Sequence, residues 1–259
     1  MGSERRGDRP DRRGGFERGP HLFDLDGVLT NSARAHAHAW KQLFDQAFAS
    51  SVADRLGVVD RRPFALPSDY VDHVDGRPRR DGVVELLVGR GVDRARLAAG
   101  AELGAVVDEL AARKDALFHA EVATGRVAVY DDAPPFLEWL AAAGVPRAVV
   151  SSSRNAHLVL GSTGLDRLVD AVVDGATLAE RHLAGKPAPD SFLCGAELVG
   201  APPERCTVVE DAVVGVQAGR AGGFGRVVGM DRSGRARAGP LLAAGADLVV
   251  HALTELRPS

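Results

Sequence analysis

The second half of the chain alternates short apolar runs with segments in which apolar residues recur at helical spacing. The runs that we interpret as strands are residues 145–150, 170–173, 206–209, 226–230 and 246–250. Helices are expected in residues 155–164, 190–199, 211–222 and 239–245, with a loop before residue 190. Strands and helices that alternate through short loops are typical of a parallel sheet with helices on both faces. We therefore predict an α/β fold, a doubly wound parallel sheet of Rossmann-like architecture.

Residues 32–125 have a different pattern, with helical spacing and few strand-like runs. One apolar helix face is formed by Trp40, Leu43, Phe44, Ala47 and Phe48. Further helices are expected over residues 82–89 and about 102–122. The segment 61–82, between the helix that contains Trp40 and the helix 82–89, is rich in proline, glycine and charge, which indicates a loop. We predict a helical domain inserted into the sheet domain.

The predicted organisation has three parts. The Arg- and Gly-rich residues 1–20 carry few large apolar side chains, so we expect a disordered tail. Residues 21–31 and 126–259 form the sheet domain, and residues 32–125 form the insert.

Composition excludes several classes of function. A formal net charge of −3 gives no electrostatic case for nucleic acid. No apolar run approaches the roughly 18 residues needed to span a bilayer, and the N-terminus lacks the apolar stretch of a secretory signal. Cys194 and Cys206 have neither metal-ligand spacing nor a disulfide framework. We expect a reduced cytoplasmic protein, a monomer without membrane or nucleic-acid partners.

Two aspartates stand at the end of the first apolar run, in "LFDLDG". Asp24 and Asp26 fall on the same side of an extended chain because side chains alternate with period two. Catalysis is one interpretation, and an ordinary acidic turn or a helix cap is the alternative. The D-x-D pattern is common, so the choice depends on the rest of the chain.

Two later segments suit a phosphate group. In "VVSSSRN", Ser151 and its neighbours place hydroxyl and backbone N–H groups at a strand end, although a serine helix cap explains the same letters. In "GKPAP", a glycine and a proline flank Lys186 and could present its charge to phosphate, whereas a plain surface lysine is the alternative.

A third segment suits a metal ion. Glu210 and Asp211 stand where the strand "TVV" ends and a helix begins. Together with Asp24 and Asp26 they would form an oxygen-rich cage, which Mg²⁺ prefers over softer ligands. The alternative is that these acids only stabilise the helix N-terminus.

These four features, in this order on this architecture, resemble the haloacid dehalogenase superfamily of phosphotransferases over residues 22–256. The resemblance implies a sheet core with a mobile cap. It also implies that Asp24 is the nucleophile that forms an aspartyl-phosphate, and that Asp26 is the general acid and base. Mg²⁺ would be held by Asp24, Asp26, Glu210 and Asp211. Ser151 and Lys186 would stabilise the charge of the transferring group.

Within that superfamily the insert resembles the cap of the beta-phosphoglucomutase subgroup. His36 and Trp40 lie one helical turn apart, as in that subgroup, although helix packing is the alternative for both. Gly76 and Arg79 match the cap loop that grips the sugar phosphate, with Arg77 and Arg80 as alternatives for the arginine. The resemblance also assigns substrate contacts to Ser153, Arg154 and Asn155.

Three departures from the subgroup affect the expected substrate. Asn31 replaces an aspartate, and Ala120 replaces a cap lysine that contacts substrate phosphate, with Lys114 and His119 nearby. Pro20 removes a ladder donor, so the first strand is expected to be frayed or to begin late.

The implied activity is a Mg²⁺-dependent mutase that interconverts beta-glucose 1-phosphate and glucose 6-phosphate. A small-molecule phosphatase of the same superfamily is the alternative. A catalytically silent binding module is disfavoured because the carboxylates and Lys186 are all retained.

Overall fold

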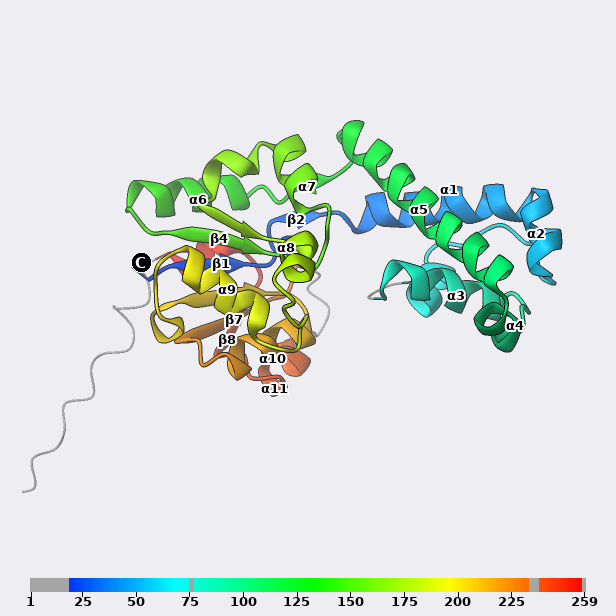
Figure 1. Cartoon of the computed structure of the whole chain (residues 1–259). Helices are drawn as coiled ribbons and strands as arrows, with labels where there is room; N and C mark the ends of the chain where they lie inside the picture. The colour runs from blue at the N-terminus through cyan, green and yellow to red at the C-terminus, as the bar shows by residue number, and fades with distance from the viewer. Residues whose placement is uncertain (1–18, 75–76, 233–237, 258–259) are drawn as a thin grey trace, which may run out of the picture. The chain divides into compact units, whose positions relative to one another are not determined.

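The computed structural model describes residues 19–74, 77–232 and 238–257. Within this part the chain divides into two compact units: residues 19–31 and 128–257 form the core, and residues 32–127 form the cap (Figure 1). The expected tail, residues 1–20, lies almost entirely outside the described residues.

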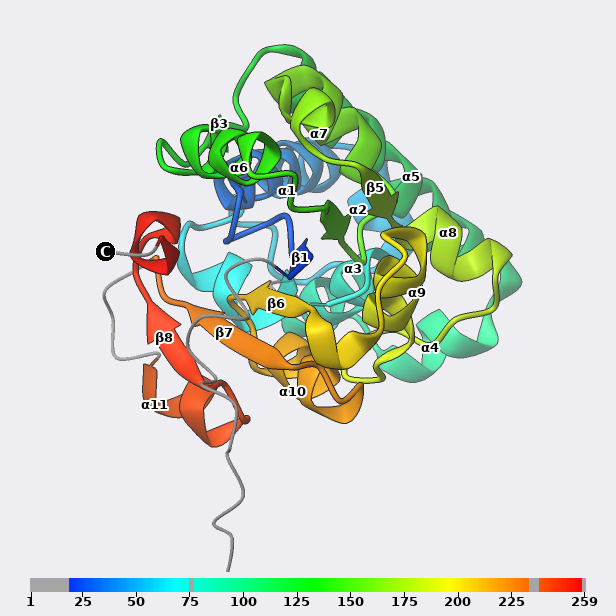
Figure 2. The same ribbon diagram turned by 90° about the vertical axis from the view of Figure 1, so that its left-hand side faces the viewer.

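The core contains a six-stranded parallel sheet in the order β5-β4-β1-β6-β7-β8. Its strands are β1 (His21–Phe23), β4 (Arg147–Val150), β5 (Ala171–Val173), β6 (Thr207–Glu210), β7 (Arg226–Met230) and β8 (Leu248–Val250). Figure 2 labels all of them except β4, which is labelled in Figure 1. The predicted doubly wound parallel sheet is confirmed. The central strand β1 begins directly after Pro20, whose carbonyl accepts a hydrogen bond from the N–H of Thr207 on β6.

Helices cover both faces of the sheet. Leu22 belongs to an apolar cluster with α9 (Asp190–Leu198), α10 (Val213–Ala221) and α11 (Ala238–Ala243). The next residue of β1, Phe23, points to the opposite face and meets Phe136 edge-on. Phe136 belongs to α6 (Ala133–Ala142), and α7 (Ala156–Thr163) follows β4. Because the central strands β1, β4 and β6 are buried on both faces, they read as continuous apolar runs rather than as alternating ones.

Some short elements of the core were not predicted. The segment expected to be a loop before residue 190 contains α8 (Gly175–Glu180), which begins where the Asp174 carboxylate accepts hydrogen bonds from the N–H groups of Ala176 and Thr177. A two-stranded antiparallel sheet, β2 (Thr30–Asn31) and β3 (Ala128–Val129), lies at the two points where the chain passes between the units. Helices and strands this short contain too few residues for a period of apolar positions to be recognised in the sequence.

The cap is helical, as predicted. Its helices are α1 (Ala33–Phe48), α2 (Ser51–Leu56), α3 (Arg79–Gly89), α4 (Arg94–Ala99) and α5 (Ala101–Ala123), with a π-helical turn η2 (Tyr70–Val74). The prediction of a loop over residues 61–82 was therefore partly wrong. The predicted apolar face of α1 is buried in the cap core, where the rings of Trp40, Phe44 and Phe64 stack in succession.

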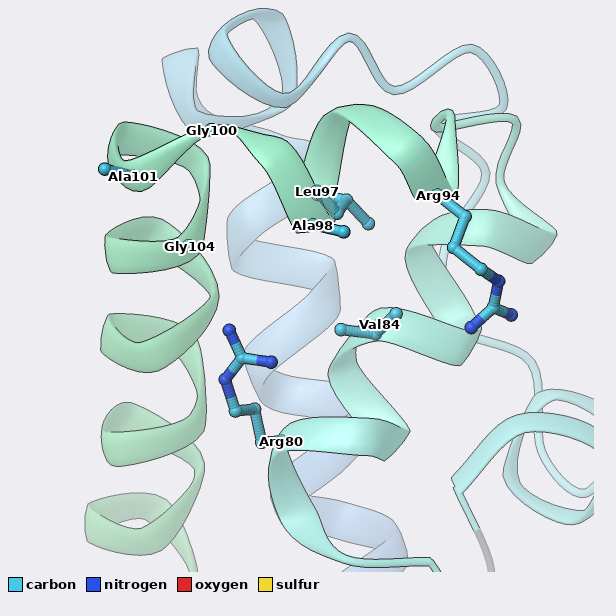
Figure 3. A pocket seen from close by; sticks show the side chains of 8 residues that line it. All are labelled: Arg80, Val84, Arg94, Leu97, Ala98, Gly100, Ala101 and Gly104. Carbon is cyan, nitrogen blue, oxygen red and sulfur yellow. The ribbon is translucent and has the colours of Figure 1, made fainter.

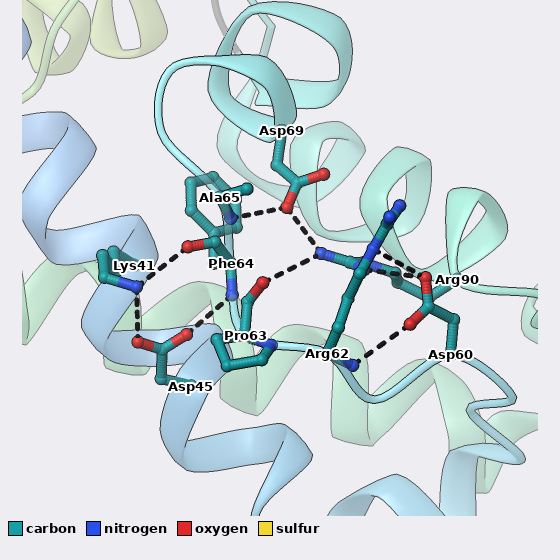
Figure 4. A network of polar contacts seen from close by, with 9 residues as sticks. All are labelled: Lys41, Asp45, Asp60, Arg62, Pro63, Phe64, Ala65, Asp69 and Arg90. Carbon is teal, nitrogen blue, oxygen red and sulfur yellow. Dashed lines mark hydrogen bonds and ion pairs between the residues drawn. The ribbon is translucent and has the colours of Figure 1, made fainter.

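The segment between α2 and η2 is held by a buried arginine rather than by backbone ladders (Figure 4). The guanidinium of Arg90, at the end of α3, donates to the Asp69 carboxylate at 2.5 Å and to Asp60 at 2.9 Å. Asp69 also accepts from the N–H of Ala65. Because a buried arginine that loses its partners costs several kcal/mol, this network fixes the irregular segment.

Candidate active site

The carboxyl ends of three neighbouring strands meet at one buried ammonium group. Lys186 Nζ donates to Asp24 Oδ1 at 2.6 Å, to Glu210 Oε1 at 2.9 Å and to the carbonyl of Val150 at 3.1 Å. Asp24 follows β1 and its N–H bonds the carbonyl of Val209 on β6. The Lys186 side chain is only 6% exposed. The surface-lysine interpretation was therefore wrong, and the structure brings Asp24, Lys186 and Glu210 together.

Burial and opposite charge act against each other in this cluster. Burial alone would lower the pKa of Lys186, but the Asp24 and Glu210 carboxylates outweigh it and hold the pKa above its ordinary value. Burial raises the pKa of Glu210, with Lys186 opposing that shift and Asp24 adding to it. The lysine is charged, and it stands between two carboxylates that would otherwise repel each other.

Asp26 is positioned by a tight turn, not by strand alternation. Because β1 ends at Phe23, the argument from period two does not apply beyond that residue. The turn is closed by the N–H of Gly27, which donates to the Thr30 carbonyl at 2.7 Å. The Thr30 hydroxyl donates to Asp26 Oδ1 at 3.1 Å. The two aspartates therefore have different partners: Asp24 meets a lysine, and Asp26 meets a hydroxyl.

Asp211 lies against the same turn. Gly27 has φ +89°, and a Cβ there would stand 2.1 Å from Asp211 Oδ2, so only glycine lets this carboxylate approach the backbone. The described residues contain no group of three His, Cys, Asp or Glu side chains already gathered as metal ligands. The side-chain oxygens at this edge nevertheless include the carboxylates of Asp24, which follows β1, and of Glu210, at the end of the neighbouring strand β6. Carboxylate oxygens fit a hard cation such as Mg²⁺.

The predicted serine segment builds a turn that leads into α7. Ser151 is buried, and its hydroxyl accepts from the N–H of Ser153, whose own hydroxyl accepts from the N–H of Asn155. Ser151 follows Val150, whose carbonyl binds Lys186, so this segment adjoins the charged cluster. Asn155 is buried, whereas Arg154 is exposed.

Within the cap, a second buried lysine contacts the predicted histidine. Lys114 Nζ lies 2.6 Å from His36 Nδ1, and the His36 ring stacks on Phe118 at 4.0 Å. Because a charged lysine can only donate, Nδ1 accepts and Nε2 carries the proton. Burial lowers the pKa of His36 to about 3, with Lys114 and Arg79 adding to the shift. Lys114 is 3% exposed and was not among the predicted site residues. The sequence signal for it was the Lys114–Phe118 spacing of one helical turn on α5.

The other residues predicted to contact substrate from the cap have different surroundings. Trp40 is 4% exposed and packs on Phe44, which favours helix packing over substrate contact. Arg79 pairs with Asp115 at 2.6 Å, and Arg80 pairs with Asp108 at 2.7 Å. Gly76 lies outside the described residues.

A cavity of about 550 Å³ lies in the cap, with α3, α4 and the start of α5 in its walls (Figure 3). Its lining is Arg80, Val84, Arg94, Leu97, Ala98, Gly100, Ala101 and Gly104. Both arginines are engaged, Arg80 with Asp108 and Arg94 with Glu85. Of the residues considered for substrate contact that the structure describes, only the alternative Arg80 lines this cavity.

The class of protein can now be stated, because a known family matches the same part of the chain. Residues 22–223 match the haloacid dehalogenase-like hydrolase family. The chain belongs to this family, and it is an enzyme of the phosphotransferase and hydrolase class.

Particular relatives narrow the comparison. The chain is 48% identical to the beta-phosphoglucomutase of Mycobacterium tuberculosis over 239 residues, 91% of this chain and 90% of that protein. It is 30% identical to hexitol phosphatase A of Escherichia coli, over 78% of each chain. The crystal structure of beta-phosphoglucomutase from Clostridium difficile matches with a TM-score of 0.67 at 21% identity, covering 92% of this chain and 93% of that one. This last likeness shows the shared fold.

Two further expectations concern the whole chain. None of the helices in the described ranges has both the length and the apolar character needed to cross a membrane. Cys194 and Cys206 are both buried free thiols. Burial raises the pKa of Cys206 to about 11, so this thiol is not a nucleophile near neutral pH.

Proposed function

We propose that this chain is a Mg²⁺-dependent beta-phosphoglucomutase that converts beta-D-glucose 1-phosphate to D-glucose 6-phosphate through an aspartyl-phosphate on Asp24. The observation that carries the proposal is the buried contact of Lys186 with Asp24 and Glu210 at the carboxyl ends of β1 and β6. The 48% identity to the mycobacterial mutase supports the sugar phosphate as substrate.

Asp24 attacks phosphorus in the first half-reaction. Its Oδ1 is held by Lys186, which fixes the carboxylate and keeps the remaining oxygen for the new bond. The ammonium group then faces the charge that develops on the transferring phosphoryl group, where a preorganised cation in a buried site stabilises the transition state most. Ser151, on the adjoining strand end, adds a second polar group.

Asp26 moves the proton. It protonates the leaving sugar oxygen and then removes a proton from the hydroxyl that takes the phosphoryl group, so that one carboxyl group serves both half-reactions. The Thr30 hydroxyl orients this carboxylate. Asp24 cannot share the task because one of its oxygens is bound to Lys186 and the other forms the bond to phosphorus.

The charge balance of the cluster supports the cofactor. The carboxylates of Asp24, Glu210 and Asp211 carry three negative charges against the single positive charge of Lys186, so a divalent cation would neutralise the set. Mg²⁺ would be held by these carboxylates and the Asp26 carbonyl, and it would reduce the repulsion between the phosphate and its nucleophile.

Cap residues provide the sugar-phosphate contacts in this proposal. Arg79 suits bidentate phosphate binding, and its present partner Asp115 holds the guanidinium in place until substrate arrives. His36 offers Nε2–H as a neutral donor because Lys114 occupies Nδ1. We also propose that the enzyme works as a cytoplasmic monomer.

A phosphatase is the second candidate, favoured by one specific observation. Ala120 stands where mutases use a lysine on the substrate phosphate, and a weaker grip on the intermediate would let water take the phosphoryl group.

One assay separates these two activities. The enzyme is given beta-glucose 1-phosphate, Mg²⁺ and a trace of glucose 1,6-bisphosphate, while glucose 6-phosphate and free phosphate are followed together. Glucose 6-phosphate without free phosphate is the expected result. Stoichiometric phosphate release would establish the phosphatase, and the Asp24→Asn variant serves as the blank for both products.

A further inference from the structure

The turn that carries Asp26 is held from the outside by an arginine on a distant part of the chain. Arg232, which follows β7, donates from Nη2 to the carbonyl of Val28 at 2.6 Å. Val28 lies in the middle of the turn between Asp26 and Thr30, the residue whose hydroxyl orients Asp26. The neighbouring carbonyl of Leu29 accepts from the N–H of Tyr130 at 3.1 Å. Two successive carbonyls of the turn are therefore fixed by groups outside it.

Arg232 is itself anchored firmly. Its Nη1 donates to both carboxylate oxygens of Asp132, at 2.8 and 2.7 Å, and its guanidinium lies 4.1 Å from the centroid of the Tyr130 ring. Asp132 precedes α6 and also accepts from the N–H of Leu253 at 2.6 Å. The Arg232 side chain is 11% exposed. A guanidinium group can bind a carboxylate with one arm and a carbonyl with the other, which a lysine cannot do with the same geometry.

We propose that Arg232 is a positioning residue that sets the orientation of the general acid and base, Asp26, through the Val28 carbonyl. The inference rests on the proposed role of Asp26. Asp24 is fixed independently, through Val209 and Lys186, so the loss of Arg232 misplaces the proton donor while the nucleophile stays in position.

This division predicts a defect that depends on the leaving group. An acyl phosphate expels a stable carboxylate and requires no proton from the enzyme, whereas a sugar phosphate expels an alkoxide that must be protonated. In both reactions an Asp24 oxygen forms the bond to phosphorus and the bond to the leaving oxygen breaks. Only with the sugar does a proton pass from Asp26 to that oxygen.

The experiment measures phosphoenzyme formation by rapid quench, with acetyl phosphate and with glucose 1,6-bisphosphate as donors, in the presence of Mg²⁺. For Arg232→Met we expect a rate about 100-fold lower with the bisphosphate, and a change of less than about threefold with acetyl phosphate. Arg232→Lys keeps the charge and loses the two-armed geometry, so it should show the same selective defect. Equal losses with both donors, or no loss with either, would overturn the proposal.

Two controls separate the possible failures. Asp26→Asn must show the selective defect, and if it does not, the proposed role of Asp26 has failed rather than the role of Arg232. Arg147→Met removes an arginine that is also 11% exposed and paired with an aspartate, Asp170, at 2.6 Å, but at the first residue of β4, away from the turn. This variant should have a lower free energy of unfolding, and any change in the rate of phosphoenzyme formation should be the same with both phosphate donors. If Arg232→Met does not fold, Arg232→Lys and Asp132→Asn decide the question in the same way.

Discussion

Each unit of this enzyme buries a lysine, and the two lysines lie in different surroundings. In the core, Lys186 contacts the carboxylates of Asp24 and Glu210 at the ends of parallel strands. In the cap, Lys114 meets the neutral ring of His36, with Trp40 and Phe118 beneath its ammonium group. The ammonium group of the core lysine neutralises part of the charge of these two carboxylates. The cap lysine instead contacts a neutral ring on another helix and sets the tautomer of that ring.

The largest expected effect is in the core. Asp24→Asn removes the nucleophile while keeping the size of the side chain, so kcat should fall by about 10⁴-fold or more. The phosphoenzyme should be absent from rapid-quench samples. Circular dichroism and the Tm serve as the folding control, and retained turnover in a folded sample would show that Asp24 is not the nucleophile.

The same contrast explains what the sequence could predict. The core was predictable because its apolar strands read as continuous runs and its charged residues stand directly after them, as Asp24 and Glu210 do. Asp26 was placed on the same side as Asp24 for the wrong reason, since the turn closed by Gly27 and Thr30 positions it, not strand alternation. Such a turn depends on hydrogen bonds between residues that no periodicity connects.

The cap was less predictable because its site depends on pairs between different helices. Nothing in the spacing indicates that Lys114 of α5 meets His36 of α1, or that Arg79 pairs with Asp115. Arg232 was missed for a similar reason: it lies 204 residues from Val28, its partner in the turn.

The next effect belongs to the cap. Arg79→Ala should raise the KM for beta-glucose 1-phosphate by about 100-fold, since hydrogen bonds between charged groups contribute about 1.5–3 kcal/mol. The kcat should change much less than the KM because the core groups are untouched. Steady-state kinetics measure both constants.

Arg80→Ala is the matched control for Arg79. Arg80 is the next residue of α3 and is also paired with an aspartate, Asp108. Its loss should leave the KM within about threefold of the wild-type value, because surface ion pairs contribute little. The reverse result would move the phosphate contact from Arg79 to Arg80.

A smaller effect concerns stability in acid. Burial lowers the pKa of His21 in the core to about 4, whereas an unfolded histidine titrates near 6.5. Between these values the unfolded chain takes up a proton that the folded core refuses, so stability falls as the pH drops from about 6.5 to 4. At pH 5 the loss is about 2 kcal/mol. His21→Phe, which keeps an aromatic ring, should remove this contribution.

Single-tryptophan variants allow the two units to be compared in that experiment. Trp139 lies in α6 of the core and Trp40 in α1 of the cap. The free energy of unfolding in denaturant is measured between pH 4 and 7 in the Trp40→Phe variant, with Trp139 as the probe. This free energy should depend less on pH when His21 is also replaced. If the free energy of unfolding varies with pH to the same extent with and without His21, then His21 is protonated in the folded core.

The smallest effect tests the lysine of the cap directly. Lys114→Met keeps an unbranched side chain against the Trp40 and Phe118 rings and removes the charge beside His36. The pKa of His36, lowered to about 3 by burial, Lys114 and Arg79, should rise but stay below its ordinary value because burial persists. Imidazole resonances followed by NMR report this pKa. Lys41→Met, on the same helix as His36 but bonded to the Phe64 carbonyl, should leave it unchanged. If neither variant moves the titration, burial and Arg79 account for the lowered pKa of His36, and Lys114 does not contribute to it.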